Sequence, residues 1–122
     1  MSQIAPSTPE QGRLAVYAAA KVMGIPLVDV PYDGTIGERI ESLALSVSGE
    51  LLVLLPARTE AWWFTRLPAR HICLLHEQLT GEGQARDGRY PCAVQYIGRH
   101  PDRFRAAFSP LGLMYGQAGG LV

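Results

Sequence analysis

Two short strings in this chain follow apolar segments and carry side chains suited to binding or chemistry. The first, Asp29-Val30-Pro31-Tyr32, supplies a carboxylate and an aromatic ring. The second follows the apolar run 51–55 and supplies an arginine, a hydroxyl and two indoles. Its candidate binding residues are Arg58, Thr59, Trp62 and Trp63. Groups at the carboxyl ends of adjacent parallel strands converge on one crevice, where open α/β sheets bind ligands. We therefore expect the two strings to form one candidate site.

The second string also has purely structural interpretations. Arg58 and Thr59 suit a phosphate or a partner's carboxylate, and Thr59 is equally suited to capping a helical turn expected over residues 59–64. Trp62 and Trp63 are adjacent, so they do not share a helix face. We expect one indole in the core and the other exposed or at an interface, where tryptophan is a frequent hot spot.

The first half of the chain predicts the strand–helix–strand unit that positions these strings. A helix is expected over residues 10–23, ended by Gly24, and strands are expected over 25–30 and 51–55. The first helix has one face with helical spacing, formed by Leu14, Tyr17, Ala18, Lys21 and Val22. A second helix over 35–46 has Ile36, Ile40, Leu43 and Leu45 as its buried stripe. The uninterrupted apolar run 51–55 indicates a strand buried on both faces.

The second half predicts two more strands and a helix. Residues 70–75 and 91–98 are expected to form an antiparallel pair joined by a loop over 76–87. A helix over 100–108 would place Phe104 and Phe108 in the core. The glycine-rich segment 112–122 gives no regular prediction. The order predicts an α/β fold, a small mixed sheet of about four strands with flanking helices, in one domain over 10–122 after a flexible tail over 1–9.

Composition restricts the function classes. Formal net charge is zero, with 11 basic and 11 acidic residues, whereas dedicated nucleic-acid binders carry a basic excess. The second half is nonetheless rich in arginine, and Arg99, Arg103 and Arg105 beside His100 form a candidate anion patch or, as we favour, a solvated helix face. The start lacks a basic segment followed by an apolar one, and no apolar run is long enough for a membrane span. We expect a cytoplasmic protein with no membrane partner.

Four residues have side chains that bind zinc in other proteins: His71, Cys73, His76 and Cys92. His71 and Cys73 would alternate onto one face of a strand, and Cys92 would lie on the neighbouring strand. Their spacing matches no zinc module, and buried free cysteines are common. We expect reduced thiols and no metal.

Several strings resemble the phage and plasmid DNA adenine methyltransferases, over roughly residues 28–112. Besides the first string, the resemblance includes Gly34-Thr35-Ile36-Gly37-Glu38-Arg39-Ile40 and the run 54–64, beginning Leu54-Leu55-Pro56-Ala57-Arg58-Thr59. It also includes Tyr90-Pro91-Cys92-Ala93-Val94-Gln95-Tyr96. The resemblance implies the carboxyl-terminal half of a Rossmann-like methyltransferase fold. It further implies that Asp29 accepts the adenine amine, that Tyr32 stacks on the flipped base, and that Pro31 fixes the turn between them. Val30 replaces the family's first proline.

The same resemblance identifies what the chain lacks. The family holds S-adenosylmethionine on a glycine-rich turn after the first strand of its sheet, and only about 24 residues precede the first expected strand here. The Gly116-Gln117-Ala118-Gly119-Gly120 string follows no expected strand and opens no helix. We therefore expect no cofactor and no autonomous methyl transfer.

Loss of half a sheet leaves the strand 25–30 as an edge with unpaired backbone groups, which must be covered. The helix over 10–23, a second copy pairing edge to edge, or a partner's strand would each cover it. The leading hypothesis is a degenerate, non-catalytic methyltransferase-like protein of a mobile element. It would bind a protein, as a homodimer or to counter a host defence complex such as restriction or CRISPR. One alternative is a half-enzyme that needs dimerisation or a partner to bind S-adenosylmethionine; another is a small DNA-binding module.

Overall fold

The computed structural model describes residues 9–77, 79–80 and 89–116. The tail expected over residues 1–9 lies outside this part of the chain except for its last residue. Most of the loop expected over 76–87 and the end of the glycine-rich segment also lie outside it.

Five strands within the described part form one open mixed sheet in the order β1-β2-β6-β3-β7. Their bounds are β1 Leu27–Asp29, β2 Leu51–Pro56, β3 His71–Leu75, β6 Cys92–Ile97 and β7 Gly112–Gly116. β1 and β2 are parallel, and every other neighbouring pair in this sheet is antiparallel. The predicted α/β class is confirmed, and the open sheet is consistent with half of a Rossmann-like fold.

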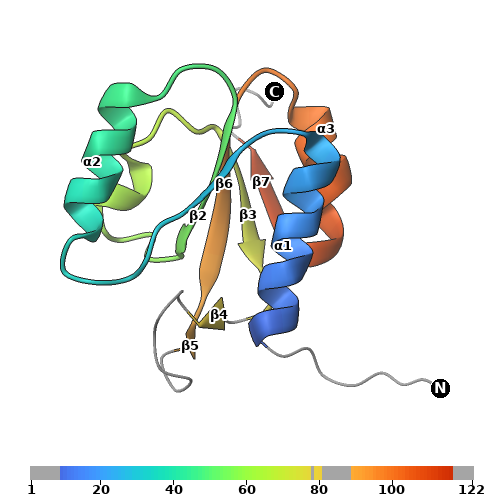
Figure 1. Ribbon diagram of the computed structural model, residues 1–122, viewed down its shortest axis with the longest axis horizontal. Coiled ribbons are helices and arrows are strands. Elements are labelled where there is room, and N and C mark those ends of the chain that lie inside the picture. Colours follow the sequence, from blue (N-terminus) through green and yellow to red (C-terminus); the bar gives the residue numbers. More distant parts are fainter. Residues whose placement is uncertain (1–8, 78, 81–88, 117–122) are drawn as a thin grey trace.

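Helices cover both faces of the sheet (Figure 1). α1 (Pro9–Met23) and α3 (Pro101–Phe108) lie on one side, and α2 (Ile36–Ser46) lies on the other with the 3₁₀ turn η1 (Trp62–Thr65). Every residue of β2 and β6 is buried, as expected for central strands between two helical layers. A second 3₁₀ turn, η2 (Ser109–Leu111), leads into β7.

Each face of the sheet has its own apolar core. On the α1–α3 side, the Tyr96 ring stacks on Phe104 with 5.2 Å between centroids, and Phe104 contacts Phe108. On the α2 side, Ile36 and Ile40 pack against the sheet together with Trp63 and Phe64 of η1. The predicted core positions of the two phenylalanines are confirmed.

The predicted buried face of α1 was wrong, and that of α2 was wrong at one position. In α1 the buried residues are Val16, Ala19, Ala20 and Met23, whereas Leu14 and Val22 are exposed. Both faces have helical spacing, and the small alanines allow the helix to approach its neighbours closely, so packing selected the less apolar-looking face. In α2, Ile36 and Ile40 are buried and Leu43 packs against the same core, as predicted, but Leu45 is 76% exposed because at 3.6 residues per turn it lies on the opposite side of the helix from Ile36.

Three element boundaries also differ from the sequence prediction. The first strand is limited to Leu27–Asp29, where it pairs with β2. Within the expected loop, β4 (Leu79–Thr80) pairs with β5 (Arg89–Tyr90) as a separate antiparallel ribbon. The helical turn starts at Trp62 after Ala61 and has no side-chain cap, so Thr59 does not cap it.

Candidate functional site

The carboxyl ends of β1 and β2 lie side by side, as the sequence predicted for its two strings. Asp29 at the end of β1 is opposite Leu54 of the parallel strand β2. Tyr32 follows shortly after β1, and Arg58 follows shortly after β2. A guanidinium N–H of Arg58 donates to the Tyr32 hydroxyl, and the guanidinium carbon lies 5.8 Å from the centre of the Tyr32 ring. The structure therefore brings the carboxylate, the aromatic ring and the arginine to one end of the sheet.

The Asp29 carboxylate is bound by two side chains of α1. Arg13 forms an ion pair with Oδ2, and the Tyr17 hydroxyl donates to the same oxygen at 3.1 Å. The side chains of Arg13 and Asp29 are only 16% and 13% exposed. One of the two carboxylate oxygens is thus already an acceptor in a largely buried ion pair.

Tyr32 is similarly engaged by the chain itself. The rings of Tyr32 and Tyr90 pack edge to face, with 5.2 Å between their centroids. Arg58, besides contacting Tyr32, forms an ion pair with Glu60. Pro31 is half-buried beside these groups, and Thr59 is exposed. Asp29, Tyr32 and Arg58 are thus each in contact with other side chains of the protein.

The chain matches no protein-family model, and the comparisons with curated proteins and with solved structures also return no match.

The two tryptophans have different environments, as expected. Trp63 is 8% exposed and contacts Phe64 in the core on the α2 side. Trp62 is 62% exposed and lies on α2 against Gly37. A Cβ at Gly37 would approach the indole to 2.7 Å, so only glycine leaves room for the ring. Buried Gln95 also fixes the turn, because its Nε2 donates to the Phe64 carbonyl at 2.6 Å.

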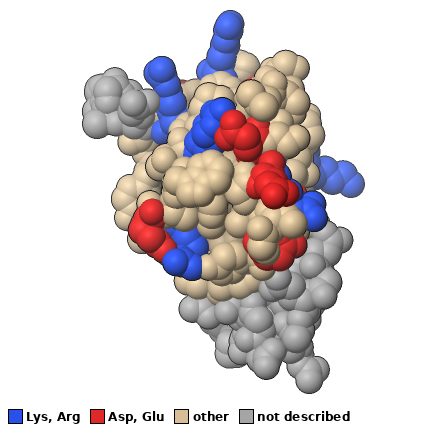
Figure 2. Space-filling view, turned by 90° about the vertical axis from the view of Figure 1, so that its left-hand side faces the viewer, with Lys and Arg blue, Asp and Glu red and all other residues tan. Residues whose placement is uncertain are grey.

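Trp62 borders a shallow surface groove along α2. The groove is lined by Gly37, Glu38, Glu41, Ser42, Leu45 and Trp62. Trp62 and Leu45 are both large apolar side chains left exposed. In the view facing α2, uncharged side chains form the centre of the surface, with acidic and basic groups around them (Figure 2).

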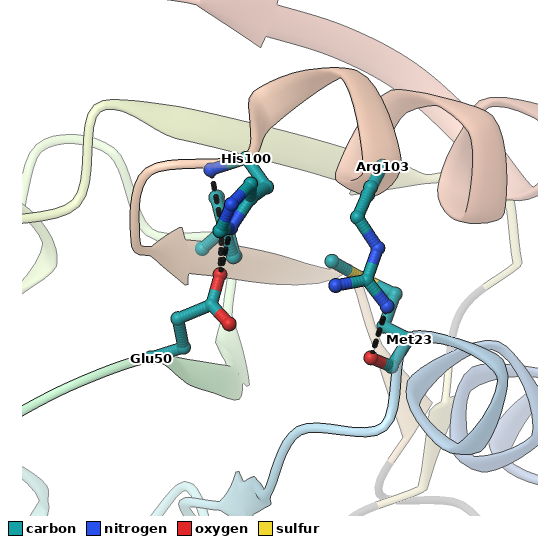
Figure 3. Close-up of polar contacts among 5 residues, drawn as sticks. Met23, Glu50, His100 and Arg103 are labelled. Carbon is teal, nitrogen blue, oxygen red and sulfur yellow. Dashed lines mark hydrogen bonds and ion pairs between the residues drawn. The ribbon is translucent and has the colours of Figure 1, made fainter.

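A third group of polar side chains lies at the opposite end of the sheet, where β2 begins. Glu50 Oε2 accepts hydrogen bonds from the Tyr96 hydroxyl and from His100 Nδ1, the latter at 2.9 Å (Figure 3). The backbone N–H of His100 donates to the Tyr96 hydroxyl at 2.8 Å. Hydrogen bonds from His100 and Tyr96 hold the pKa of Glu50 below its ordinary value.

The candidate anion patch is divided by this arrangement. Arg103 Nη2 points toward α1 and donates to the Met23 carbonyl at 2.6 Å (Figure 3), so it closes the carboxyl end of that helix. Arg99 instead lines a pocket together with Glu50 and His100. The two arginines therefore have different environments.

The four candidate metal ligands do not form one cluster. Within the described residues, no group of three or more His, Cys, Asp or Glu side chains is arranged to hold a metal ion. Cys73 and Cys92 face the α1–α3 core from neighbouring strands, and both thiols are free and buried. Cys73 Sγ donates to the Phe108 carbonyl and Cys92 Sγ to that of Tyr90. Burial raises the pKa of each thiol to about 11.

Sequence reasoning missed the residues that fill the first site and complete the third. Tyr17 was assigned only to one face of its helix, and Arg13 was given no role. Glu50 precedes a strand and had no recognisable pattern around it.

None of the helices in the described part is long and apolar enough to cross a lipid bilayer.

Proposed function

We propose that this protein acts by binding another protein through the Trp62 surface and does not transfer a methyl group. The observation that carries the proposal is the exposed indole lying against Gly37 in the same groove as exposed Leu45. Tryptophan is enriched among residues that dominate binding energy, and its rigid ring offers a large contact area at a low cost in conformational entropy. The surface is thus suited to receiving an apolar anchor of a partner.

The state of the Asp29 site supports the non-catalytic part. Arg13 neutralises the Asp29 charge, and Oδ2 already accepts from Arg13 and Tyr17, so the carboxylate is a weaker acceptor for a substrate's N–H. Opening that site requires α1 side chains to release a largely buried charge, which is energetically costly. Tyr32 would in addition have to separate from Tyr90 to stack on a base.

Charge indicates what kind of partner fits the groove. The charged side chains among the described residues that line the groove are Glu38 and Glu41. Glu41 also accepts two hydrogen bonds from the Arg66 guanidinium, of 2.7 and 2.9 Å. The matching surface is an apolar side chain flanked by lysine or arginine. The resemblance to phage and plasmid proteins directs the search to host defence complexes.

The binding proposal is tested by photo-crosslinking in cells from a reactive residue placed at Ser42, inside the groove. The crosslinked partner is then purified and its affinity measured by calorimetry. Trp62→Ala should weaken binding about 30-fold, the effect of losing a typical hot spot. Gly37→Ala should also weaken it, because the added methyl displaces the indole.

Tyr115→Ala is the matched control, since Tyr115 is an exposed aromatic on β7 at the far edge of the sheet. Its effect should stay within about twofold. Equal affinity of the Trp62→Ala variant and the unmodified chain would refute the binding surface. Transfer of tritiated methyl groups from S-adenosylmethionine to DNA at enzyme-like rates would refute the non-catalytic part and favour the half-enzyme.

A further inference from the structure

A pocket of about 600 Å³ lies at the end of the sheet opposite Asp29 and Tyr32. It is formed where β2 and β3 begin and β6 ends. Its polar lining residues are Glu50, Arg70, His71, Tyr96, Arg99 and His100. Pro68 and Ile97 contribute apolar wall. A volume of this size accommodates a small organic ligand.

The two arginines of the pocket differ from the others. Among the arginines whose side chains the structure describes, Arg70 and Arg99 are those with no hydrogen bond or ion pair to another described residue. The remaining ones bond to carboxylates, a hydroxyl or a carbonyl, as in the pairs of Arg66 with Glu41 and Arg103 with Met23. The two exposed arginines without a protein partner among the described residues thus line the same pocket. A guanidinium presents a planar fork of donors that matches phosphate oxygens.

The two histidines of the pocket add further hydrogen-bonding groups. His100 uses Nδ1 to contact Glu50, which leaves Nε2 on the other side of its ring for a ligand. Burial, followed by nearby Arg105 and Arg70, lowers the pKa of His71, so its imidazole is neutral at pH 7. A neutral imidazole both donates and accepts, which suits the ester oxygen or hydroxyls of a ligand.

Glu50 is the acidic residue that lines the pocket, and its charge opposes an anion. However, Oε2 of Glu50 is the shared acceptor for His100 and Tyr96, and Arg103 lies close enough to lower its pKa further. The carboxylate therefore positions the histidine while its charge is offset locally. The excess charge of the pocket comes from Arg70 and Arg99.

We infer that this pocket binds a small phosphate monoester, with its phosphate between Arg70 and Arg99. The cavity is much larger than phosphate alone, so the organic part of the ligand occupies the remaining space beside Pro68 and Ile97. The site is independent of the Trp62 surface, which lies on the α2 face, and of any methyl transfer.

Calorimetric titration of the full chain with adenosine monophosphate, inorganic phosphate and adenosine tests this inference at about physiological salt. The nucleotide should bind with a Kd of about 0.1–1 mM, phosphate should bind more weakly, and adenosine should not bind measurably. In a heteronuclear NMR titration, the amide signals of residues 70–71 and 99–100 should shift first. Phosphate binding equal to that of the nucleotide would make the free ion the ligand and overturn the monoester assignment.

The variant Arg70→Met/Arg99→Met should lose at least about tenfold in affinity for the nucleotide, because two charge-assisted contacts are removed. Both side chains are exposed, so the fold is retained, and unchanged NMR signals of β2 confirm it. Arg39→Met, an exposed arginine on α2, is the control and should bind normally. The inference is overturned if no ligand binds at about 10 mM, if adenosine binds as well as the nucleotide, or if the double variant binds equally well.

Discussion

Replacement of Arg13 by methionine tests whether the Asp29 carboxylate is a structural anchor. The change keeps most of the apolar stem and removes the charge that neutralises Asp29. Loss of one partner of a fully buried ion pair costs about 3–5 kcal/mol, whereas an exposed pair contributes about 0–1 kcal/mol. The side chains here are 16% and 13% exposed, and Tyr17 still donates to the carboxylate after the change. We expect a loss of about 2–3 kcal/mol in the free energy of unfolding.

Urea unfolding followed by the fluorescence of buried Trp63 measures this loss. With a denaturant slope of about 2 kcal/mol/M, the midpoint should fall by about 1 M or more. A second change, Asp29→Asn, should restore about 1–2 kcal/mol in the Arg13→Met background, since it removes the uncompensated charge. The coupling between the two positions then distinguishes the ion pair from other packing of the Arg13 side chain.

The ion pair of Glu41 with Arg66 is the control, because it has comparable geometry but side chains that are 38% and 42% exposed. Arg66→Met should cost less than about 1 kcal/mol. If Arg13→Met is as stable as the unmodified chain, or if Asp29→Asn does not rescue it, α1 does not hold the carboxylate. The non-catalytic interpretation of the site would then lose its main support.

Two further predictions concern buried sulfur and a close backbone contact. Cys73 and Cys92 should resist a thiol reagent at pH 8 until the chain unfolds, and rapid labelling of the folded chain at that pH would contradict this. Burial raises the pKa of each thiol to about 11 from an ordinary value of 9.0. The stability that the two thiols contribute is therefore complete below pH 9 and should decline between pH 9 and 11. Gly112→Ala should lower the free energy of unfolding, measured in urea, by about 1–3 kcal/mol, because the added Cβ would lie 2.1 Å from the Leu74 carbonyl oxygen. The control Gly34→Ala, with open space around its Cβ, should change that free energy by less than about 0.5 kcal/mol. Equal stability of the two variants would refute the close-contact argument.

The sequence predicted those parts of the fold that depend on local patterns. The uninterrupted apolar run of β2 correctly indicated a central strand, and Gly24, with a φ of 74°, ends α1 as expected. β7 was not predicted because Gly112–Gly116 has little strand propensity of its own. It forms because β3 offers an unpaired edge and because Gly112 permits the close approach to Leu74. Tertiary pairing supplied what local preference lacked.

The candidate site was predicted in part for a similar reason. The convergence of Asp29, Tyr32 and Arg58 follows from the parallel pairing of two strands, which the apolar runs and their connecting helix indicate. The contacts of Arg13 with Asp29 depend instead on which face of α1 is buried. That face was predicted incorrectly, because leucine and valine at other helical positions gave the stronger pattern. An error in helix rotation thus concealed the ion pair.

The two ends of the sheet differ in a way that bears on where ligands bind. At the carboxyl ends of β1 and β2, each charged group has an internal partner, and a ligand must displace it. At the opposite end, Arg70 and Arg99 line a pocket and have no bonded partner among the described residues, so a ligand gains contacts without breaking any. Open α/β sheets ordinarily bind ligands at the carboxyl ends of their parallel strands. Here β6 runs antiparallel to β2, so the carboxyl end of β6 lies beside the amino end of β2 at the pocket that Arg70 and Arg99 line. A ligand in that pocket does not have to break contacts within the protein, whereas a ligand at Asp29 and Tyr32 does. Ligand binding is therefore favoured at the pocket of Arg70 and Arg99.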